Sequence, residues 1–344
     1  MFPPESTVAS LGRRPKSALI LAPETALLLY GEAGLAEIRS ASELVVTIDD
    51  PSSLAARPAI LAEVEVLFTG WGCPRIDGSV LAAAPQLRAV FFAGGTLRYW
   101  ISDAVWERGL IVVGAYSVNA IPVAEFTLAA VLLSLKRTWH YLGQHKSTAA
   151  YPLPKVPSPG AHHSTVGLIG LGEIGRLVRE RLRPFELDIL AFDPYADTTV
   201  AKELGVTLAS LEEVFRRSDV VSLHAPHLPS TEGMITGAHL ASMRPGATFI
   251  NTARGQIVRE AEMAEVLRAR EDLTALLDVL AEEPPAPDNP LLGLPNVFIT
   301  PHIAGSLDRE CLRMGELVLA EFARWVRGEP LRHQITREKA ATLA

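Results

Sequence analysis

The chain has 344 residues, is 48% hydrophobic and 21% charged, and carries a formal net charge of −7 at pH 7. This length predicts two domains, each large enough to bury a core. The acidic balance argues against a general nucleic-acid binder, because contacts to phosphates need clustered Lys and Arg.

The two cysteines, Cys73 and Cys311, lie far apart in the sequence. They are too few for a disulfide framework or a cysteine-based zinc site, so we expect no metal and a reducing compartment. The first six residues lack the basic and apolar regions of a signal peptide. Both observations favour the cytoplasm.

The first third of the chain alternates short apolar segments with helical stretches. The expected strands are residues 18–21, 44–48, 66–69, 89–93 and 111–114, and helical stretches at 53–63 and 103–108 lie between them. Such β-α repetition predicts a parallel sheet covered by helices.

A long apolar helix is expected next, over 121–141, with Asn119 or Ala120 near its cap and Pro122 in its first turn. Its most apolar part, 126–135, is too short to span a bilayer, so we expect no membrane partner. Apolar residues run nearly all the way round the helix, which must therefore be covered on most faces. The cover comes from a second domain of the chain, from a second copy, or from both, and we favour the mixture.

Residues 143–164 are polar and Pro-rich, which predicts a surface crossing between domains. A second β-α series follows. Its expected strands are 166–169, 187–192, 220–224, 248–251, 275–279 and 297–300; a Pro-rich loop at 283–290 and a closing helix at 306–327 complete the chain.

The first strand of this series runs into a glycine motif. Gly170, Gly172 and Gly175 give G-x-G-x-x-G between an apolar strand and a helical segment. The first glycine allows a tight turn, the second lets a pyrophosphate approach the backbone, and the third lets helix and strand pack closely. Asp193, 18 positions after the third glycine, ends the next strand, where an acceptor for a ribose hydroxyl is expected. Together these features predict a dinucleotide site.

Ligands of open α/β sheets bind beyond the carboxyl ends of the strands, in the loops that follow them. The loops selected by this rule contain Ala225, Pro226 and Thr231, then Thr252, Ala253 and Arg254, then Glu282 and Glu283, and finally His302 and Gly305. An Arg, a Glu and a His therefore each follow a strand end on one side of one sheet, where we expect them to converge on the nicotinamide end of the cofactor.

Three of these side chains suit hydride transfer to a keto acid. Arg254 can hold a carboxylate bidentately and polarise the carbonyl. His302 can donate a proton to the developing alkoxide, and Glu283 can orient the imidazole. Taken alone, each residue fits a surface ion pair or a solvated loop better. Their joint placement beside a dinucleotide motif reverses that weighting.

Over residues 110–330 these segments resemble the D-isomer-specific 2-hydroxyacid dehydrogenase family. The motifs that carry the resemblance are, in chain order, residues 123–125, 167–175, 193–195, 221–224, 243–247 and 251–255, Asp278-Val279 with Glu283-Pro284, and residues 300–305.

The resemblance implies that Arg254, Glu283 and His302 are the catalytic set. Glu283 is preferred to Glu282 because the acid of the family directly precedes a proline. It also implies an NAD pocket, with Asp278 at the carboxamide end. The residues expected to line that pocket are Glu173, Ile174, Asp193, Thr231, Thr252, Ala253 and Asp278. Asp193 favours NAD over NADP, because a carboxylate repels a 2′-phosphate.

The implied fold is α/β with two doubly wound parallel-sheet domains. A Rossmann NAD-binding domain would cover 119–305, and a discontinuous flavodoxin-like substrate domain would cover 1–118 and 306–344, with the active site in the cleft between them. The resemblance also implies a homodimer built around the 121–141 helix.

The substrate loop departs from the family pattern. Gly94, Gly95 and Thr96 remain, so backbone N–H groups could still cradle a carboxylate. The usual polar pair is replaced by Arg98, Tyr99 and Trp100. One interpretation is that these three residues contact an unusual substrate. The other, which we favour, is that Tyr99 and Trp100 pack in the hydrophobic core.

The expected function is therefore NAD-dependent interconversion of a small D-2-hydroxy acid and its 2-keto acid. One alternative is an NAD(H)-sensing binding protein that resembles the C-terminal-binding-protein corepressors, which keep the same catalytic residues. Another is a small-anion dehydrogenase similar to the formate and phosphite enzymes. The Glu283–His302 pair favours a hydroxy acid as the substrate. The sequence does not define which hydroxy acid it is.

Overall fold

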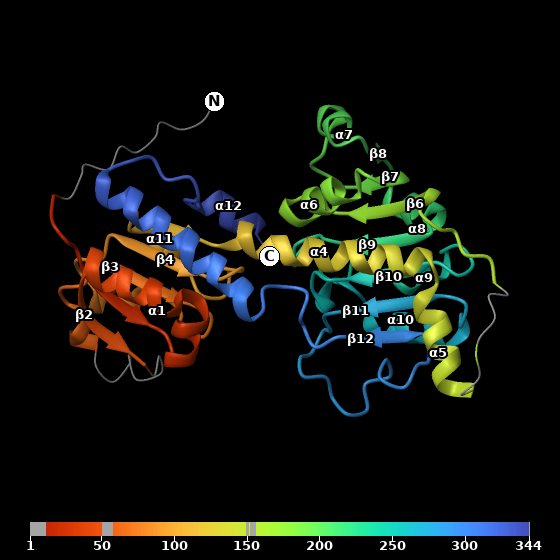
Figure 1. Ribbon diagram of the computed structural model, residues 1–344, viewed down its shortest axis with the longest axis horizontal. Coiled ribbons are helices and arrows are strands. Elements are labelled where there is room, and N and C mark those ends of the chain that lie inside the picture. Colours follow the sequence, from red (N-terminus) through yellow and green to blue (C-terminus); the bar gives the residue numbers. More distant parts are fainter. Residues whose placement is uncertain (1–11, 50–57, 149–150, 152–155, 344) are drawn as a thin grey trace. The chain divides into compact units, whose positions relative to one another are not determined.

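The computed structural model describes residues 12–49, 58–148, 151 and 156–343, and the chain divides into two compact units. The first contains the described residues up to Asn119 together with Ser306–Leu343, and the second contains those of Ala120–Gly305. Each unit is built on one parallel sheet with helices packed on it (Figure 1). The predicted class, α/β with two doubly wound parallel-sheet domains, is confirmed.

The first sheet has the strand order β2-β1-β3-β4-β5, and every pairing is parallel. This is the order of flavodoxin-like folds. Its strands lie where the apolar runs predict them: β1 (Lys16–Ile20), β2 (Glu43–Ile48), β3 (Val66–Gly70), β4 (Ala89–Ala93) and β5 (Ile111–Gly114).

Helices cover both faces of the first sheet. Helices α1 (Pro23–Ala41) and α11 (Leu312–Arg327) share a buried cluster with one face, whereas α2 (Gly78–Ala83) and α3 (Asp103–Glu107) share a cluster with the other. The remaining short elements of this unit are η2 (Pro58–Leu61), η4 (Asp308–Cys311) and α12 (Arg337–Thr342). The helix predicted over 53–63 lies partly outside the described residues, and its described part contains η2.

Helix α11 explains why the first unit is discontinuous. It lies beside α1 (Figure 1), and a Cβ added to Gly315 would stand 2.1 Å from the carbonyl oxygen of Leu29. The ring of Phe322 meets Phe68 and Phe91 edge-on, with centroids 4.9 and 5.4 Å apart. Such aromatic burial fixes the C-terminal segment on strands that lie more than 200 residues earlier in the sequence. The closing helix predicted over 306–327 begins later, at Leu312, because the 3₁₀ turn η4 precedes it.

The second sheet has the order β12-β11-β10-β9-β6-β7-β8, again with parallel pairings. This is the Rossmann order extended by one strand. Its strands are β6 (His162–Ile169), β7 (Glu186–Phe192), β8 (Thr207–Leu208), β9 (Val220–Leu223), β10 (Thr248–Asn251), β11 (Thr274–Leu277) and β12 (Val297–Ile299). Strand β8 was not predicted, because two residues are too few to show an alternating pattern of apolar side chains.

Two helical layers cover the second sheet. The helical elements of this part are α4 (Tyr116–Leu135), α5 (Thr138–Thr148), α6 (Glu173–Leu182), α7 (Thr198–Leu204), α8 (Leu211–Arg217), α9 (Gly237–Ala241), η3 (Gly255–Ile257) and α10 (Glu260–Ala269). Residues of α4 and α6 share one buried cluster with the sheet, and residues of α8, α9 and α10 share the other.

The single helix predicted over 121–141 is wrong in its bounds. Helix α4 begins at Tyr116, so Pro122 lies inside it rather than in its first turn. It ends at Leu135, and Arg137, with a φ of 54°, separates it from α5. By length and composition, α4 is the one helix in the described part of the chain that could cross a membrane; half of it is buried in the protein.

Residues 143–164 are not a crossing between the two units. Helix α5 continues to Thr148 and β6 begins at His162, and both belong to the second unit. The chain passes between units at Asn119–Ala120 and at Gly305–Ser306 instead. Proline and polar residues mark an exposed connection, but they do not show which elements it joins.

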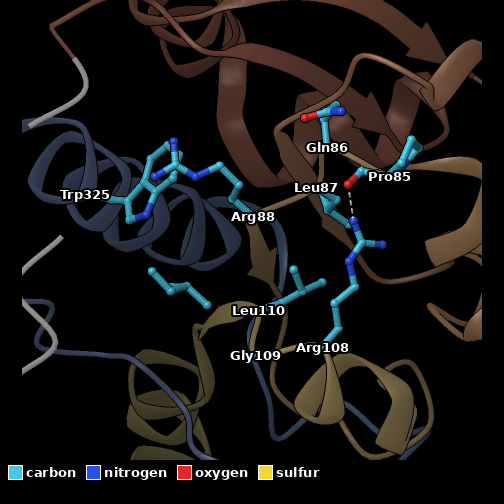
Figure 2. Close-up of a pocket in the computed structure, with 9 residues that line it drawn as sticks. Pro85, Gln86, Leu87, Arg88, Arg108, Gly109, Leu110 and Trp325 are labelled. Carbon is cyan, nitrogen blue, oxygen red and sulfur yellow. Dashed lines mark hydrogen bonds between the residues drawn. The ribbon is translucent and has the colours of Figure 1, made fainter. Parts of the chain in front are cut away.

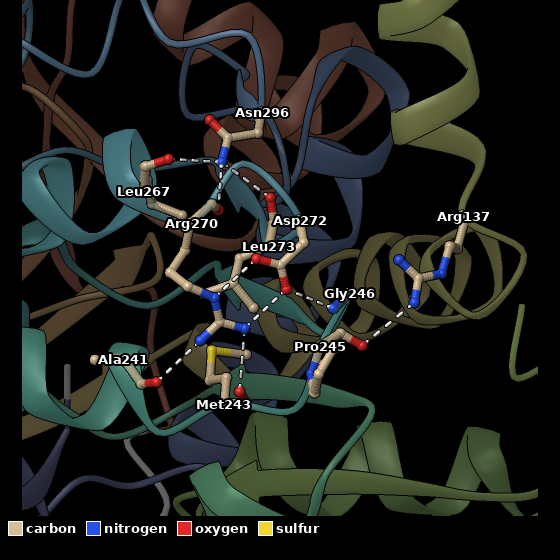
Figure 3. Close-up of polar contacts among 10 residues, drawn as sticks. All are labelled: Arg137, Ala241, Met243, Pro245, Gly246, Leu267, Arg270, Asp272, Leu273 and Asn296. Atoms are coloured by element: carbon tan, nitrogen blue, oxygen red, sulfur yellow. Dashed lines mark hydrogen bonds and ion pairs between the residues drawn. The ribbon is translucent and has the colours of Figure 1, made fainter. Parts of the chain in front are cut away.

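A polar cluster holds the turn before β11 at the amino-terminal edge of the second sheet (Figure 3). Arg270 binds both carboxylate oxygens of Asp272, at 2.8 Å each, and donates to the carbonyl oxygens of Ala241 and Met243. Asp272 also accepts from the backbone N–H of Gly246 at 3.0 Å. This edge lies opposite the loops that carry the candidate site.

Candidate active site

The glycine turn after β6 is shaped by two close backbone approaches. Gly170 has a φ of 94°, and a Cβ there would stand 2.8 Å from the backbone nitrogen of Ala225. A Cβ on Gly175 would stand 2.1 Å from the carbonyl oxygen of Gly170. Packing within the protein therefore requires the first and third glycines of the motif.

Gly172 is different, because no atom of the described residues, its two chain neighbours aside, lies within 4 Å of the position its Cβ would take. It is the N-cap of α6, where no side chain caps the helix, and Glu173 and Ile174 form the first turn. The backbone N–H groups of that turn and the positive end of the helix favour an anion. Open space and unused donors at this glycine fit a pyrophosphate.

Asp193 ties the end of β7 to the glycine turn. Its Oδ2 accepts from the backbone N–H of Leu171 at 2.7 Å, and its Oδ1 accepts from that of Tyr195 at 2.8 Å. A carboxylate oxygen has two lone pairs, so each oxygen can accept one further hydrogen bond. The carboxylate is thereby fixed beside the glycine turn with capacity left for a ribose hydroxyl.

The three catalytic candidates follow neighbouring strands. Arg254 follows β10, Glu283 follows β11 and His302 follows β12, and these strands lie side by side in the sheet. Since the strands are parallel, all three loops leave the same edge. Loops close in space thus carry residues up to 48 positions apart in sequence.

His302 and Glu283 are in direct contact: Nδ1 of His302 lies 2.7 Å from Oε2 of Glu283. The other oxygen, Oε1, accepts from the backbone N–H of Leu280 at 3.0 Å, which fixes the carboxylate. The backbone N–H of His302 donates to the carbonyl oxygen of Asp278 at 2.9 Å, and its φ of 54° lies in the left-handed region. The side chain of His302 is 48% exposed, so it remains accessible to a reactant.

Asp278 holds the loop that carries His302. Its side chain is buried and accepts from the hydroxyl of Thr300 at 2.6 Å, and from the backbone N–H groups of Ile303 and Ala304 at 2.9 Å each. A carboxylate with three such donors is well compensated for its burial. This holding role came only from the structure.

Asn251 orients the loop of Arg254 in the same way. Its Oδ1 accepts from the backbone N–H of Ala253 at 2.9 Å, and its Nδ2 donates to the carbonyl oxygen of Arg254 at 3.1 Å. The half-buried guanidinium of Arg254 donates from Nη1 to the carbonyl oxygen of Ala253 at 2.6 Å. This role of Asn251 was not predicted from the sequence, although an Asn at a strand end is a common start of such a turn.

Gly255 lets the loops after β10 and β11 touch. A Cβ at this position would stand 1.9 Å from the carbonyl carbon of Leu280. Gln256 then donates from Nε2 to the carbonyl oxygen of Ala281 at 2.6 Å. The Arg254 loop is therefore packed against the Glu283 loop with no space for a side chain between them.

Comparison with known proteins identifies the second unit. The family model for the NAD-binding domain of D-isomer specific 2-hydroxyacid dehydrogenases matches residues 129–304. The chain belongs to that family. The unit Ala120–Gly305 is therefore a NAD-binding domain, as the glycine motif predicts.

The names of similar proteins support this assignment. The D-3-phosphoglycerate dehydrogenase of Archaeoglobus fulgidus is 33% identical over 261 residues, which are 76% of this chain and 49% of that protein. The glyoxylate reductase of Korarchaeum cryptofilum is 32% identical over 303 residues, 87% of this chain and 91% of that protein. A phosphoglycerate oxidoreductase structure from Rhizobium etli has 26% identity and a TM-score of 0.76, covering 94% and 99% of the two chains. This chain spans about half the length of the phosphoglycerate dehydrogenases that it matches.

The other predicted cofactor residues of this dehydrogenase-family domain lie in the same loops. Ala225 and Ala253 are buried, Pro226 and Gly305 are half-buried, and Thr252 is buried with its hydroxyl 3.3 Å from that of Thr127. Thr231 donates to the carbonyl oxygen of Pro226 at 2.6 Å and accepts from the backbone N–H of Leu228 at 2.8 Å. Their contacts to a cofactor remain predictions.

His224 was missed as a residue of this site. It lies at the end of β9 against the glycine turn and is buried, and burial lowers its pKa to about 3. Neither ring nitrogen has a hydrogen-bond partner among the described residues. The imidazole is therefore neutral at pH 7. A buried unpartnered polar group is not visible in a sequence pattern.

The loop predicted to bind substrate lies in the first unit, after β4. A Cβ on Gly94 would stand 3.1 Å from Nε1 of Trp71, and a Cβ on Gly95 would stand 2.6 Å from Nδ2 of Asn119. The buried hydroxyl of Thr96 has no partner within the described chain.

The two aromatic residues that follow this loop differ in environment. Trp100 packs against the hydrophobic cluster of this unit, as favoured from the sequence. Tyr99 does not, because 55% of it is exposed.

Proposed function

We propose that this protein is an NAD-dependent oxidoreductase that interconverts a small D-2-hydroxy acid and its 2-keto acid. The observation that carries the proposal is the 2.7 Å contact between His302 and Glu283, on loops next to that of Arg254. A proton donor with its orienting acid beside a guanidinium is the set that carbonyl reduction needs. Family membership and the Gly172 turn support the cofactor assignment.

Each residue has a defined task in this proposal. Arg254 binds the substrate carboxylate and polarises the carbonyl through its paired N–H donors. His302 gives a proton to the oxygen during reduction and takes it back during oxidation. Because Glu283 holds Nδ1, the Nε2 atom of His302 is left to face the substrate. The bound nicotinamide supplies or accepts the hydride.

The first unit would supply the substrate loop. Backbone N–H groups of Gly94, Gly95 and Thr96 would hold the carboxylate. Asp193 supports NAD rather than NADP. Partly exposed apolar residues near α4, such as Leu133 (40%) and Leu142 (46%), support a homodimer through the 121–141 segment. The proposed location is the cytoplasm.

A direct test mixes the purified protein with NADH and a panel of 2-keto acids: glyoxylate, hydroxypyruvate, pyruvate, and branched and aromatic keto acids. Loss of NADH absorbance with at least one of them is expected, and His302→Ala should abolish it. Tight NADH binding without oxidation of NADH by any keto acid of the panel would refute the proposed enzymatic activity and indicate an NAD(H)-sensing protein. Turnover by His302→Ala at the wild-type rate would refute the assigned chemistry.

A further inference from the structure

A cavity lies in the first unit, at the amino-terminal edge of its sheet (Figure 2). Its volume is about 550 Å³, and it is lined by residues 85–88 before β4, by residues 108–111 at the start of β5, and by Trp325 of α11. The predicted substrate loop, Gly94–Thr96, follows the opposite end of β4. The cavity and that loop are therefore separated by the length of a strand.

Arg88 forms one side of the cavity. Its guanidinium carbon lies 5.3 Å from the centroid of the Trp325 ring, a cation–π contact that holds the exposed side chain in place. Within the described chain it makes no ion pair. Its charge helps to lower the pKa of Glu65, but that carboxylate is bound by Arg13 at 2.6 and 2.7 Å.

Arg108 forms the opposite side, where Figure 2 shows its side chain reaching toward Pro85. Its guanidinium donates to the carbonyl oxygens of Leu81 at 2.7 Å, Ala84 at 2.8 Å and Pro85 at 2.5 Å. These contacts fix the group at the end of α2. All three acceptors are uncharged, and no described carboxylate pairs with Arg108, so its positive charge is not neutralised.

Apolar side chains complete the cavity. Leu87 and Leu110 are buried, Ile111 is half-buried, and the indole of Trp325 is fully buried beneath Arg88. The Nε1 donor of Trp325 has no partner among the described residues. The cavity thus combines two guanidinium groups that form no ion pair among the described residues with a mixed polar and apolar lining.

We propose that this cavity binds a small organic dianion, a phosphate monoester or a dicarboxylate, at a site separate from the active site. Two guanidinium groups match two negative charges: Arg88 presents a planar fork suited to a phosphate or carboxylate, and Arg108, whose terminal nitrogens bind backbone carbonyls, adds a fixed positive charge. The apolar part of the lining can pack against the carbon skeleton of such a ligand. The volume lies within the usual range for small-molecule sites, about 300–1,000 Å³.

Isothermal titration of the full-length protein tests the proposal, with glycerol phosphate, succinate, acetate and inorganic phosphate as probes. We expect saturable binding of glycerol phosphate or succinate, with one molecule bound per chain. The probe that binds shows whether the ligand is a phosphate monoester or a dicarboxylate. Acetate should bind at least about tenfold more weakly. Arg88→Gln should weaken dianion binding at least about tenfold. The matched control Arg39→Gln, an exposed arginine on α1, should leave it unchanged.

Arg254→Gln distinguishes this site from the active site, where an anion is also expected. Dianion binding that survives Arg254→Gln supports the proposal, and binding that disappears with it overturns the proposal. Absence of saturable binding up to about 10 mM, or equal affinity in Arg88→Gln and wild type, also overturns it.

A second measurement needs no variant at Arg88. In protein labelled with 5-fluorotryptophan, the ¹⁹F resonance of Trp325, assigned with Trp325→Phe, should shift on addition of the dianion. The resonance of Trp139, in the second unit, should not move. Shifts of both resonances together, or of neither, would contradict the assigned site.

Discussion

Nδ1 of His302 lies 2.7 Å from Oε2 of Glu283, although the two residues follow different strands and are 19 positions apart. The backbone N–H of Leu280 holds the other carboxylate oxygen, and Asp278 holds the loop of His302. The pair is therefore built into the sheet edge before any reactant arrives. Such preorganisation is what a proton-transferring pair needs.

Replacing His302 by Asn should lower kcat about 10²- to 10⁴-fold, because the proton donor is lost. Glu283→Gln should cause a smaller loss, since the imidazole stays but loses its orienting carboxylate. Steady-state kinetics with the keto acid identified from the panel gives both values. Glu282→Gln is the matched control and should keep wild-type kinetics. A larger effect at Glu282 than at Glu283 would show that the wrong acid is assigned.

Arg254→Lys should reduce kcat/KM about 10- to 100-fold, because loss of one charge-assisted hydrogen bond costs about 1.5–3 kcal/mol. The charge is kept, so the loss reports the paired N–H donors. Kinetics at several substrate concentrations separates KM from kcat. Wild-type kcat/KM in this variant would mean that a point charge is sufficient and that no bidentate contact forms.

Gly172→Ala should weaken NADH binding about tenfold or more while leaving the melting temperature unchanged. A Cβ there meets no atom of the described residues beyond its chain neighbours within 4 Å, but it occupies the space expected for the pyrophosphate. Fluorescence titration with NADH and thermal unfolding give the two values. Gly293→Ala, where a Cβ also meets nothing within 4 Å, should change neither. Unaltered NADH affinity in Gly172→Ala would place the pyrophosphate elsewhere.

Asp272 should stabilise the fold in a pH-dependent way. The hydrogen bond from Arg270, with a further one from the Gly246 backbone, lowers the pKa of Asp272 from 3.8 to about 2. Its stabilisation is therefore present above about pH 4 and is lost as the pH falls toward 2. The difference in unfolding free energy between wild type and Asp272→Asn should shrink over that range. Asp188→Asn, which removes an exposed carboxylate outside this cluster, should not reproduce the decline.

His224 should make the fold less stable in acid over a higher pH range. Burial lowers its pKa from 6.5 to about 3, so below pH 6.5 only the unfolded chain takes up this proton. Stability is therefore lost as the pH falls from about 6.5 toward 3, by up to about 1.4 kcal/mol per pH unit. Denaturant unfolding of His224→Gln should show a correspondingly weaker pH dependence. His163→Gln, at an exposed histidine, should keep the wild-type dependence.

Several structural predictions from the sequence are wrong for an identifiable reason. The break at Arg137 and the true start of α4 at Tyr116 were missed, because an apolar run shows a helix without showing where it is interrupted. The crossing assigned to 143–164 lies inside the second unit. Exposure of a segment follows from composition, whereas the elements that it joins depend on long-range packing.

The sequence by itself determined the α/β class, the positions of nearly all strands and the dinucleotide motif. These features are local: buried parallel strands are short apolar runs, and the glycine turn follows one of them directly. Strand order then places Arg254, Glu283 and His302 on neighbouring loops, which the sequence could only suggest.

Only the tertiary structure decided the contacts that depend on residues far apart in the chain. It sets the 2.7 Å His302–Glu283 contact, the buried Asp278 that holds the His302 loop, and the cavity between Arg88 and Arg108. A contact between distant residues forms only after the sheet has brought their loops together. Its geometry is therefore a property of the packed fold, and no local pattern encodes it.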